Sequence, residues 1–416
     1  MESYMEMLAN HAKHAAVAAA KLGTAEKNKG LCAVADELIM QQELILAENQ
    51  KDLKAAEEKG VKQSLIDRLA LSEKRIADMA EGLRQIASLD DPVGEILSMK
   101  VRPNGLRIGQ KRVPLGVVGI IYESRPNVTA DAFGLCFKTG NAVILRGGSD
   151  AIYSNQAIVR VIKAGLRKEK LCQDLVLLVE DTSREVVNEM MKMHGLIDVL
   201  IPRGGAGLIA NVVANSTVPV IETGTGNCHV YVDQDADLEK ALPILLNAKT
   251  QRTSVCNACE SLLVHEAIAE KFMPEIGKAL QERKVEIRGD KATQGLVRNV
   301  VPATEADWAT EYEDYIISAR VVKDIDEAIR HIRKYSTGHS EAIVTENYTN
   351  AQRFLNEVDA AAVYVNASTR FTDGGQFGFG AEIGISTQKL HARGPMGLKE
   401  LTTTKYIIYG NGQIRE

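Results

Sequence analysis

GVVGIIYESRPNVTADAFGLCFKTGNAVILRGG, residues 116–148, decides the fold of this chain. An apolar strand-like run opens it, a helical stretch follows, and a second apolar run ends in a glycine turn. Similar strand-like runs recur at 175–179, 198–201 and 218–221, with helical stretches between them. This alternation predicts a parallel sheet wound with crossover helices.

A second alternating set begins at Leu238. Its strand-like runs lie at 261–264, 285–288, 315–322, 341–345 and 361–365. Two such sets predict an α/β protein with two doubly wound α/β domains, which suits a chain of 416 residues. We therefore divide the chain into a helical lead-in at 1–98, a hairpin at 99–114, a first α/β domain at 115–232, a second at 233–366, and a glycine-rich loop with a C-terminal strand at 367–416.

The hairpin prediction rests on Asn104-Gly105, which lies between two alternating runs and is the strongest short signal for such a turn. A last short strand is expected at 405–409. Two partners are open for it, because it could pair with the hairpin of its own chain or with another subunit.

The composition argues against several classes of function. A net charge of −5, with the basic residues scattered, argues against binding to nucleic acid or to an anionic membrane. Apolar residues nowhere run long enough for a membrane span, and the N-terminus lacks the layout of a signal peptide. We therefore expect a cytoplasmic, globular protein whose six cysteines are reduced.

Cys256 lies in a polar, turn-prone run between a helix-like and a strand-like segment. A side chain in such a turn can face a cleft, and the neighbouring Lys249 and Arg252 offer positive charge that stabilises a thiolate. A buried, inert cysteine is the structural alternative. Cys256 and Cys259 also form a Cys-x-x-Cys, but no second pair accompanies it, so neither a metal site nor a redox site is favoured.

Two glycine turns, at 145–149 and 203–207, follow strands of the first domain and open helices. Their backbone N–H groups could approach phosphate oxygens, although tight strand-to-helix connections use glycine anyway. Arg146 stands where a site for an unphosphorylated ribose usually offers a carboxylate. Since arginine pairs better with a 2′-phosphate, a dinucleotide bound here is expected to be NADP rather than NAD.

Two further polar side chains are candidates for chemistry. Asn127 follows an apolar strand, where its amide could donate to an oxyanion or where it simply forms a Pro-Asn turn. Glu222 ends an apolar run, which makes it a candidate general base or a plain loop residue.

The order of these pieces resembles that of the aldehyde dehydrogenase superfamily. The matching pieces are the strand from Pro114 with Asn127 beyond it, the turn at 138–146, Glu222 before glycines, and Cys256 further on. Within the superfamily, three runs resemble the branch that reduces L-glutamate 5-phosphate, namely 252–260, 364–378 and 387–398. The likeness covers essentially the whole chain.

The resemblance implies an aldehyde dehydrogenase-like fold with a cofactor-binding first domain, a catalytic second domain and a small β oligomerisation element, made by the hairpin and the C-terminal strand. It implies reduction of L-glutamate 5-phosphate by NADPH to L-glutamate 5-semialdehyde and phosphate, the second step of proline biosynthesis from glutamate. Cys256 would carry the substrate as a thioester. A homo-oligomer is expected, and a glutamate kinase is a further partner to test, because the acyl phosphate is labile.

The same matching implies residue roles. The adenosine ribose and its 2′-phosphate fall to Arg146, Gly147, Gly148 and Ser149, the pyrophosphate to Gly204 and Gly205, and the nicotinamide ribose to Glu311, for which Glu313 is an alternative. The substrate's phosphate and amino-acid ends have as plausible partners Arg125, Arg252, Ser368, Thr369 and Arg370. The oxyanion would be held by the Asn127 amide and the Cys256 backbone N–H. Because water would destroy the thioester, we hypothesise that Glu222 helps to deprotonate Cys256.

Three other functions stay open. A hydrolytic aldehyde dehydrogenase that oxidises a small aldehyde would be active without phosphate. A cysteine hydrolase or acyltransferase would need a histidine partner for Cys256, and no histidine stands in a recognisable motif. A nucleotide-binding regulator would keep the glycine turns and tolerate Cys256→Ala.

Overall fold

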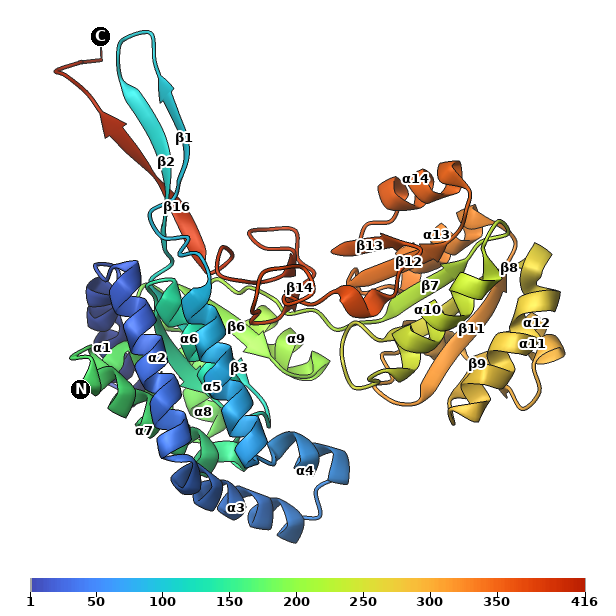
Figure 1. Cartoon of the computed structure of the whole chain (residues 1–416), viewed down its shortest axis with the longest axis horizontal. Coiled ribbons are helices and arrows are strands. Elements are labelled where there is room, and N and C mark those ends of the chain that lie inside the picture. Colours follow the sequence, from blue (N-terminus) through green and yellow to red (C-terminus); the bar gives the residue numbers. More distant parts are fainter. Residues whose placement is uncertain (1, 416) are drawn as a thin grey trace. The chain divides into compact units, whose positions relative to one another are not determined.

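The computed structural model describes residues 2–415, which form two compact units (Figure 1). The chain passes from the first unit to the second after Glu222. Two later segments, Gly378–Gly384 and the chain from Met396 onward, belong to the first unit again. Each unit contains its own parallel sheet, as the sequence predicted.

The first unit is built on a four-stranded sheet in which every neighbouring pair is parallel. In sheet order its strands are β5 (Val176–Leu178), β4 (Ala142–Arg146), β3 (Val117–Tyr122) and β6 (Val199–Arg203). The chain starts at β3, moves outward to β4 and β5, and returns to place β6 on the other side of β3. The winding direction therefore changes between β3 and β6, the position where open α/β sheets bind ligands.

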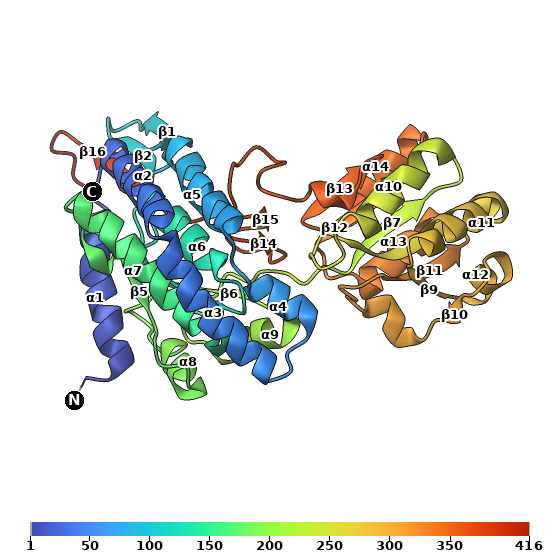
Figure 2. The same ribbon diagram turned by 60° about the horizontal axis from the view of Figure 1, so that its bottom comes forward.

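Helices cover this sheet in layers. The connecting helices are α6 (Asn127–Lys138), α7 (Ile152–Lys168), α8 (Arg184–Met190) and, after β6, α9 (Ala206–Asn215). The predicted lead-in consists of α1 (Tyr4–Ala19), α2 (Thr24–Met40), α3 (Gln42–Glu58), α4 (Gln63–Leu69) and α5 (Glu73–Ser88). Helix α1 packs on the sheet itself, whereas α2 and α5 lie side by side and pack against α6 and α7 (Figure 1, Figure 2).

A separate three-stranded antiparallel sheet also belongs to the first unit. It consists of β1 (Ile96–Val101), β2 (Arg107–Pro114) and β16 (Thr402–Tyr409), with β2 in the middle. Gly105 in the predicted turn has φ +86°, a backbone conformation that glycine adopts at little cost. Of the two partners open to the C-terminal strand, the hairpin of the same chain is the one observed.

The second unit is built on a seven-stranded parallel sheet (Figure 1). In sheet order its strands are β10 (Val301–Pro302), β9 (Glu286–Gly289), β11 (Ile316–Val322), β8 (Cys259–His265), β7 (Cys228–Val232), β12 (Ser340–Val344) and β13 (Ala362–Val365). Its helices are α10 (Leu238–Thr250), α11 (Glu266–Glu282), α12 (Lys291–Leu296), α13 (Ile325–Tyr335) and α14 (Tyr348–Glu357). A short pair, β14 (Ile385–Ser386) and β15 (Gly394–Pro395), lies outside this sheet.

Two apolar cores form on the two faces of this sheet. Val230 of β7 packs in a core with residues of α10 and α11, whereas its neighbour Tyr231 packs in a core with residues of α13 and α14. Successive side chains of a strand point to opposite faces, so both faces of β7 are covered. This is the doubly wound arrangement predicted from the sequence.

Two expectations about strands differ from the structure. Residues 218–221 form no strand, and an isolated bridge joins Val220 to Leu200 of β6. Strand β7 was not predicted, because all of its residues are buried and it therefore lacks the alternation that marks a half-buried strand. Since β7 lies in the second sheet, the units divide after Glu222 and not after residue 232.

Among the helices of residues 2–415, none is long and apolar enough to cross a membrane.

Candidate active site

Cys256 lies in the second unit, in the loop that joins α10 to β8. Its side chain is partly exposed and forms no disulfide, which fits the predicted turn rather than a buried core position. Strand β8 occupies the middle of the sheet, so Cys256 lies at the amino-terminal edge of a central strand. Apolar side chains on both faces of β8 anchor the loop that carries the thiol.

The segment that leads into β7 packs directly against the backbone of Cys256. The Cys228 thiol donates to the Cys256 carbonyl oxygen, with a distance of 3.1 Å from Sγ to oxygen. A Cβ added to Gly226 would lie 1.4 Å from the same oxygen, so this position accepts glycine alone. The Gly226–Cys228 segment therefore fixes the peptide that follows the candidate nucleophile. Sequence reasoning missed this contact, because the glycines and Cys228 carry no motif that points to Cys256.

Glu311 holds the same segment from the other side. The Gly226 backbone N–H donates to Glu311 Oε1 over 2.8 Å. Burial raises the pKa of Glu311, and the hydrogen bond from Gly226 acts in the opposite direction. For the alternative candidate, Glu313, the backbone N–H lies 3.4 Å from Glu260 Oε1. Glu311, which the sequence matched to the nicotinamide ribose, thus contacts the Gly226–Cys228 segment that packs against Cys256.

Two arginines supply the positive charge near the thiol. Burial and the neighbouring Arg252 lower the pKa of Arg370. The charge interaction with Cys256 acts in the opposite direction and raises that pKa. Since the interaction is mutual, the Arg370 guanidinium stabilises a thiolate at Cys256. The prediction that Lys249 shares this task is wrong, because Lys249 is fully buried and its Nζ lies 2.5 Å from Glu260 Oε2.

Asn257 ties the Cys256 loop to η4 (Thr369–Phe371), a short helix that follows β13. Its amide donates to the carbonyl oxygens of Arg370 and Thr372, and its own carbonyl oxygen accepts from the buried Thr369 hydroxyl at 2.7 Å. The Arg370 guanidinium donates to the Asn257 side chain and, at 2.8 Å, to Gln251 Oε1. Thr369 therefore has a structural role, because its hydroxyl holds the Cys256 loop against η4.

The other proposed substrate residues lie at two positions. Ser368 is buried, and its hydroxyl accepts from the Arg370 backbone N–H at 3.3 Å, at the start of η4. Arg125 belongs to the first unit and precedes α6, in the loop after β3. Arg252 and Arg370 are therefore the two proposed substrate residues that the structure brings together beside Cys256.

The first glycine turn of the first unit presents unsatisfied donors. Arg146 ends β4, and its guanidinium donates to the carbonyl oxygens of Gly147, Thr182 and Ser183. Its Nε is buried and has no hydrogen-bond partner among residues 2–415, and the same holds for Nδ2 of Asn155. A Cβ on Gly147 would lie 2.2 Å from that Asn155 nitrogen. Gly148 and Ser149 then lead into α7. The turn can therefore still donate to an anionic group.

The second glycine turn contacts a carboxylate that sequence reasoning missed. Gly205 caps α9, and its backbone N–H donates to Glu123 Oε2 over 2.9 Å. A Cβ on Gly204 would lie 2.6 Å from the carboxyl carbon of Glu123. Glu123 follows β3 and Gly204 follows β6, so the two meet where the winding direction changes. A pyrophosphate on this helix terminus would have to displace the Glu123 carboxylate.

Asn127 and Glu222 also lie in the first unit. Asn127 is exposed at the start of α6, and its amide donates to Asp131 Oδ2 over 3.1 Å. Burial raises the pKa of Asp131 to about 6, although the Asn127 hydrogen bond lowers it. Glu222 is half-buried at the end of the unit. The side-chain amide of Asn127 thus already serves as a donor.

Cys259, the second cysteine of the Cys-x-x-Cys, has the features of a structural residue, unlike Cys256. Cys259 is fully buried, its thiol donates to the Ser261 carbonyl oxygen at 3.4 Å, and burial raises its pKa to about 12. Within the described residues no group of three or more histidine, cysteine, aspartate or glutamate side chains could hold a metal ion.

Comparison with known proteins gives consistent matches over the whole chain. Residues 4–320 and 301–407 match the model of the aldehyde dehydrogenase family. A gamma-glutamyl phosphate reductase of Carboxydothermus hydrogenoformans is 64% identical over 408 residues, which are 98% of each chain. One of Lachnospira eligens is 62% identical over 416 residues, 100% of each chain. The crystal structure of gamma-glutamyl phosphate reductase from Thermotoga maritima is 54% identical, covers 100% of each chain and gives a TM-score of 0.97.

Proposed function

Since the chain belongs to the aldehyde dehydrogenase family, and within it to the gamma-glutamyl phosphate reductases, we propose that it reduces L-glutamate 5-phosphate to L-glutamate 5-semialdehyde and phosphate. This is the second step of proline biosynthesis from glutamate. The observation that carries the proposal is the 64% identity to a reductase of that name over 98% of the chain. A partly exposed cysteine beside two arginines agrees with it.

The first half of the reaction is a transfer of the glutamyl group to Cys256. The thiolate attacks the acyl carbon, a C–S bond forms, and the bond from that carbon to the phosphate oxygen breaks. Arg252 and Arg370 stabilise the thiolate before attack, and they can neutralise the departing phosphate. Because phosphate leaves readily, no strong acid is needed at the leaving group.

The tetrahedral intermediate carries an oxyanion that requires fixed donors. We assign these to the Cys256 backbone N–H and to the Asn127 amide, which would release Asp131 to do so. The Gly226–Cys228 segment contacts the Cys256 carbonyl oxygen, and it therefore holds the residue that carries this N–H while the acyl carbon changes from planar to tetrahedral. The Cys256 N–H is thus a fixed donor, whereas the Asn127 amide must reorient from Asp131 before it donates to the oxyanion.

The residues of the first glycine turn fit a phosphorylated nicotinamide cofactor. The buried Nε of Arg146 and Nδ2 of Asn155 have no partners within residues 2–415, so both can donate to the ribose and its 2′-phosphate. Gly147, Gly148 and Ser149 complete this binding site, and Gly204 and Gly205 would contact the pyrophosphate once Glu123 moves away. When bound, the cofactor supplies the hydride that reduces the thioester. We therefore propose NADPH rather than NADH.

Glu222 has a separate role in this proposal, the deprotonation of Cys256. Replacement by glutamine keeps the shape of the side chain and removes its basicity. The Glu222→Gln variant should therefore reduce the substrate more slowly and react with iodoacetamide more slowly at neutral pH. Unchanged rates in both assays would contradict a role for Glu222 in the deprotonation of Cys256.

The decisive experiment runs the reaction backwards, because the acyl phosphate is unstable. Purified protein receives pyrroline-5-carboxylate as the source of semialdehyde together with NADP, and NADPH absorbance is followed with and without inorganic phosphate. We expect NADPH formation that requires phosphate and is lost in Cys256→Ala. Formation without phosphate would indicate a hydrolytic aldehyde dehydrogenase. No formation at all would favour a cysteine hydrolase or a nucleotide-binding regulator.

Self-association is proposed through the three-stranded sheet. Its side chains include several exposed apolar residues, among them Val101 at 70%, Tyr406 at 70% and Ile408 at 60% exposure. The strand register places Val101 on one face of this sheet and Tyr406 and Ile408 on the other. Exposed apolar side chains gathered on one small element are usual at protein contact surfaces. A complex with a glutamate kinase and a cytoplasmic location remain predictions from the sequence.

A further inference from the structure

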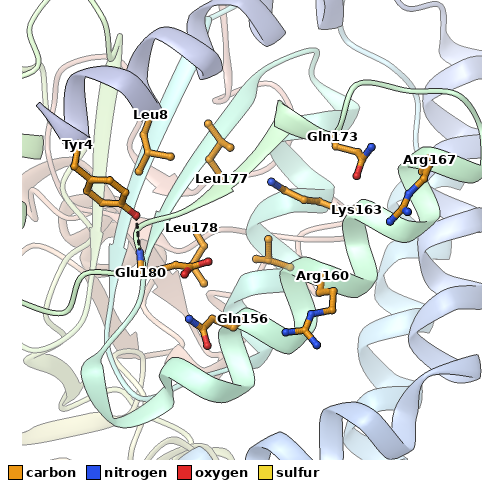
Figure 3. Close-up of a pocket in the computed structure, with 11 residues that line it drawn as sticks. Tyr4, Leu8, Gln156, Arg160, Lys163, Arg167, Gln173, Leu177, Leu178 and Glu180 are labelled. Carbon is orange, nitrogen blue, oxygen red and sulfur yellow. Dashed lines mark hydrogen bonds between the residues drawn. The ribbon is translucent and has the colours of Figure 1, made fainter. Parts of the chain in front are cut away.

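A cavity of about 590 Å³ lies within the first unit, between α1, α7 and strand β5 (Figure 3). None of the residues assigned above to the cofactor, the substrate or the chemistry lines it. Its volume falls in the range of roughly 300–1,000 Å³ that small-molecule sites occupy. Strand β5 is the edge of its sheet, so the cavity lies beside a strand that has one strand partner.

One wall of the cavity is strongly basic. Arg160, Lys163 and Arg167 project from the same face of α7, at spacings of three and four residues (Figure 3). Within residues 2–415 neither arginine forms an ion pair, and the Lys163 ammonium is 4.0 Å from Asp174, the limit for a salt bridge. Glu180 is the one acidic side chain among the lining residues. This local excess of positive charge contrasts with the net charge of −5 on the whole chain.

The rest of the lining combines apolar side chains with the amides of Gln156 and Gln173. It includes four buried aliphatic side chains, Leu8, Val159, Leu177 and Leu178. The Tyr4 hydroxyl accepts a hydrogen bond from the Glu180 backbone N–H at 3.1 Å, which joins α1 to the chain beyond β5 (Figure 3). The cavity thus combines a carbon-lined floor with cations that lack strong partners, the usual composition of a site for an organic ligand.

We propose that this cavity binds a small organic anion with at least two carboxylate or phosphate groups. Arg160 and Arg167 lie seven residues apart on a helix, which is about 10 Å along its axis. One anionic group would bind between Arg160 and Lys163, and a second would bind Arg167. The aliphatic floor would take the carbon skeleton. Such a ligand contacts both α1 and α7 and so attaches the N-terminal helix to the sheet edge.

Hydrogen exchange with two probe anions tests the proposal. Citrate supplies carboxylates and inorganic pyrophosphate supplies phosphates, and each is titrated at low salt. The peptides to follow are those that contain Tyr4–Ala19 and Val176–Leu178, because exchange is measured locally and anions bound at the active site do not interfere. We expect saturable protection of both peptides with at least one probe. The effective probe identifies the anionic group that the cavity prefers.

The matched variants carry equal changes of charge. Arg160→Gln with Arg167→Gln removes two cavity cations, whereas Lys271→Gln with Lys278→Gln removes two exposed cations of α11. We expect the cavity variant to require at least tenfold more probe for the same protection, with reductase activity unchanged, and the α11 variant to behave like the wild type. Protection by neither probe, or equal protection in the cavity variant, would overturn the proposal.

Discussion

Gly226→Ala is the most informative substitution in the second unit. The added Cβ would lie 1.4 Å from the Cys256 carbonyl oxygen and 2.6 Å from its Cα. Ordinary contacts between carbon and its neighbours are about 3.5 Å, so the two segments would have to separate by about 2 Å. The atom that must move belongs to the backbone of the nucleophile and not to a flexible side chain. The thiol therefore shifts with it.

A misplacement of about 1 Å at a reacting group can lower the rate about 100-fold, which corresponds to about 2.7 kcal/mol in the activation free energy. We expect kcat/KM of the phosphate-dependent reverse reaction to fall by at least this factor in Gly226→Ala. Alkylation of Cys256 by iodoacetamide, followed by mass spectrometry of its peptide, should also change in rate without any cofactor present.

Gly295→Ala is the matched control, because a Cβ there meets no atom within 4 Å. It should keep the activity and the alkylation rate of the wild type. A Gly226→Ala protein that is folded, fully active and alkylated at the normal rate would refute the argument that this glycine fixes the nucleophile.

Four further predictions concern charge and assembly. Lys249→Met leaves the Glu260 carboxylate buried without its cation and should lower the free energy of unfolding by about 3–5 kcal/mol. Urea titrations should show that the double variant with Glu260→Gln recovers most of this loss. Additive losses in the double variant would contradict the pairing of Lys249 with Glu260. Arg370→Gln should move the pH profile of Cys256 alkylation to higher pH, and an unmoved profile would remove Arg370 from thiolate stabilisation. Burial raises the pKa of Asp131 to about 6, so folding disfavours its charged form. Asp131→Asn should therefore stabilise the protein by about 1 kcal/mol at about pH 8, and the gain should fade as the pH falls below the pKa values of both the folded and the unfolded state, where the carboxyl is protonated in both. A gain independent of pH would refute this. Val101→Glu with Ile408→Glu should reduce the molar mass seen by light scattering, whereas Tyr348→Glu, on a helix of the second unit, should not; an unchanged mass in the double variant would exclude this sheet as the contact.

The fold was largely predictable because its rules are local. Apolar runs of strand length alternate with helical stretches, and glycines or asparagine mark their ends, so most strands were found within a few residues. Strand β7 was not predicted, because both of its faces are buried and its residues do not alternate between apolar and polar. The run at 218–221 is equally apolar, but it meets β6 only at one bridge. Composition alone does not distinguish these two cases.

The candidate site was predictable only where its functional residues lie close together in the sequence. Cys256 and Arg252 lie close in sequence, and the turn between a helix and a strand places both on one loop. The contacts of the loop come from far along the chain: Gly226 and Cys228 precede it, and Thr369 follows it by 112 residues. Glu123 and Gly205, which are 82 residues apart, were missed for the same reason.

For Lys249 the sequence predicted a contact that the structure does not form. Its charge and its closeness to Cys256 in sequence suggested that it polarises the thiol. In the structure Lys249 lies in the last turn of α10 and Glu260 is the second residue of β8, and the two side chains pair with each other in the core. Proximity in sequence predicts which charges are present, but the packing of helix on sheet decides which of them meet.

The hydrogen bonds between Asn257 and residues 369–372 have a consequence for the order in which the chain folds. During synthesis Cys256 emerges from the ribosome well before Thr369, and strand β7 must wait for β12 to gain its second strand neighbour. Contacts between residues so distant in sequence form late in folding. The cysteine of a nascent chain therefore has Arg252 beside it but lacks Arg370, and we expect it to acquire its full reactivity only when the second unit is complete.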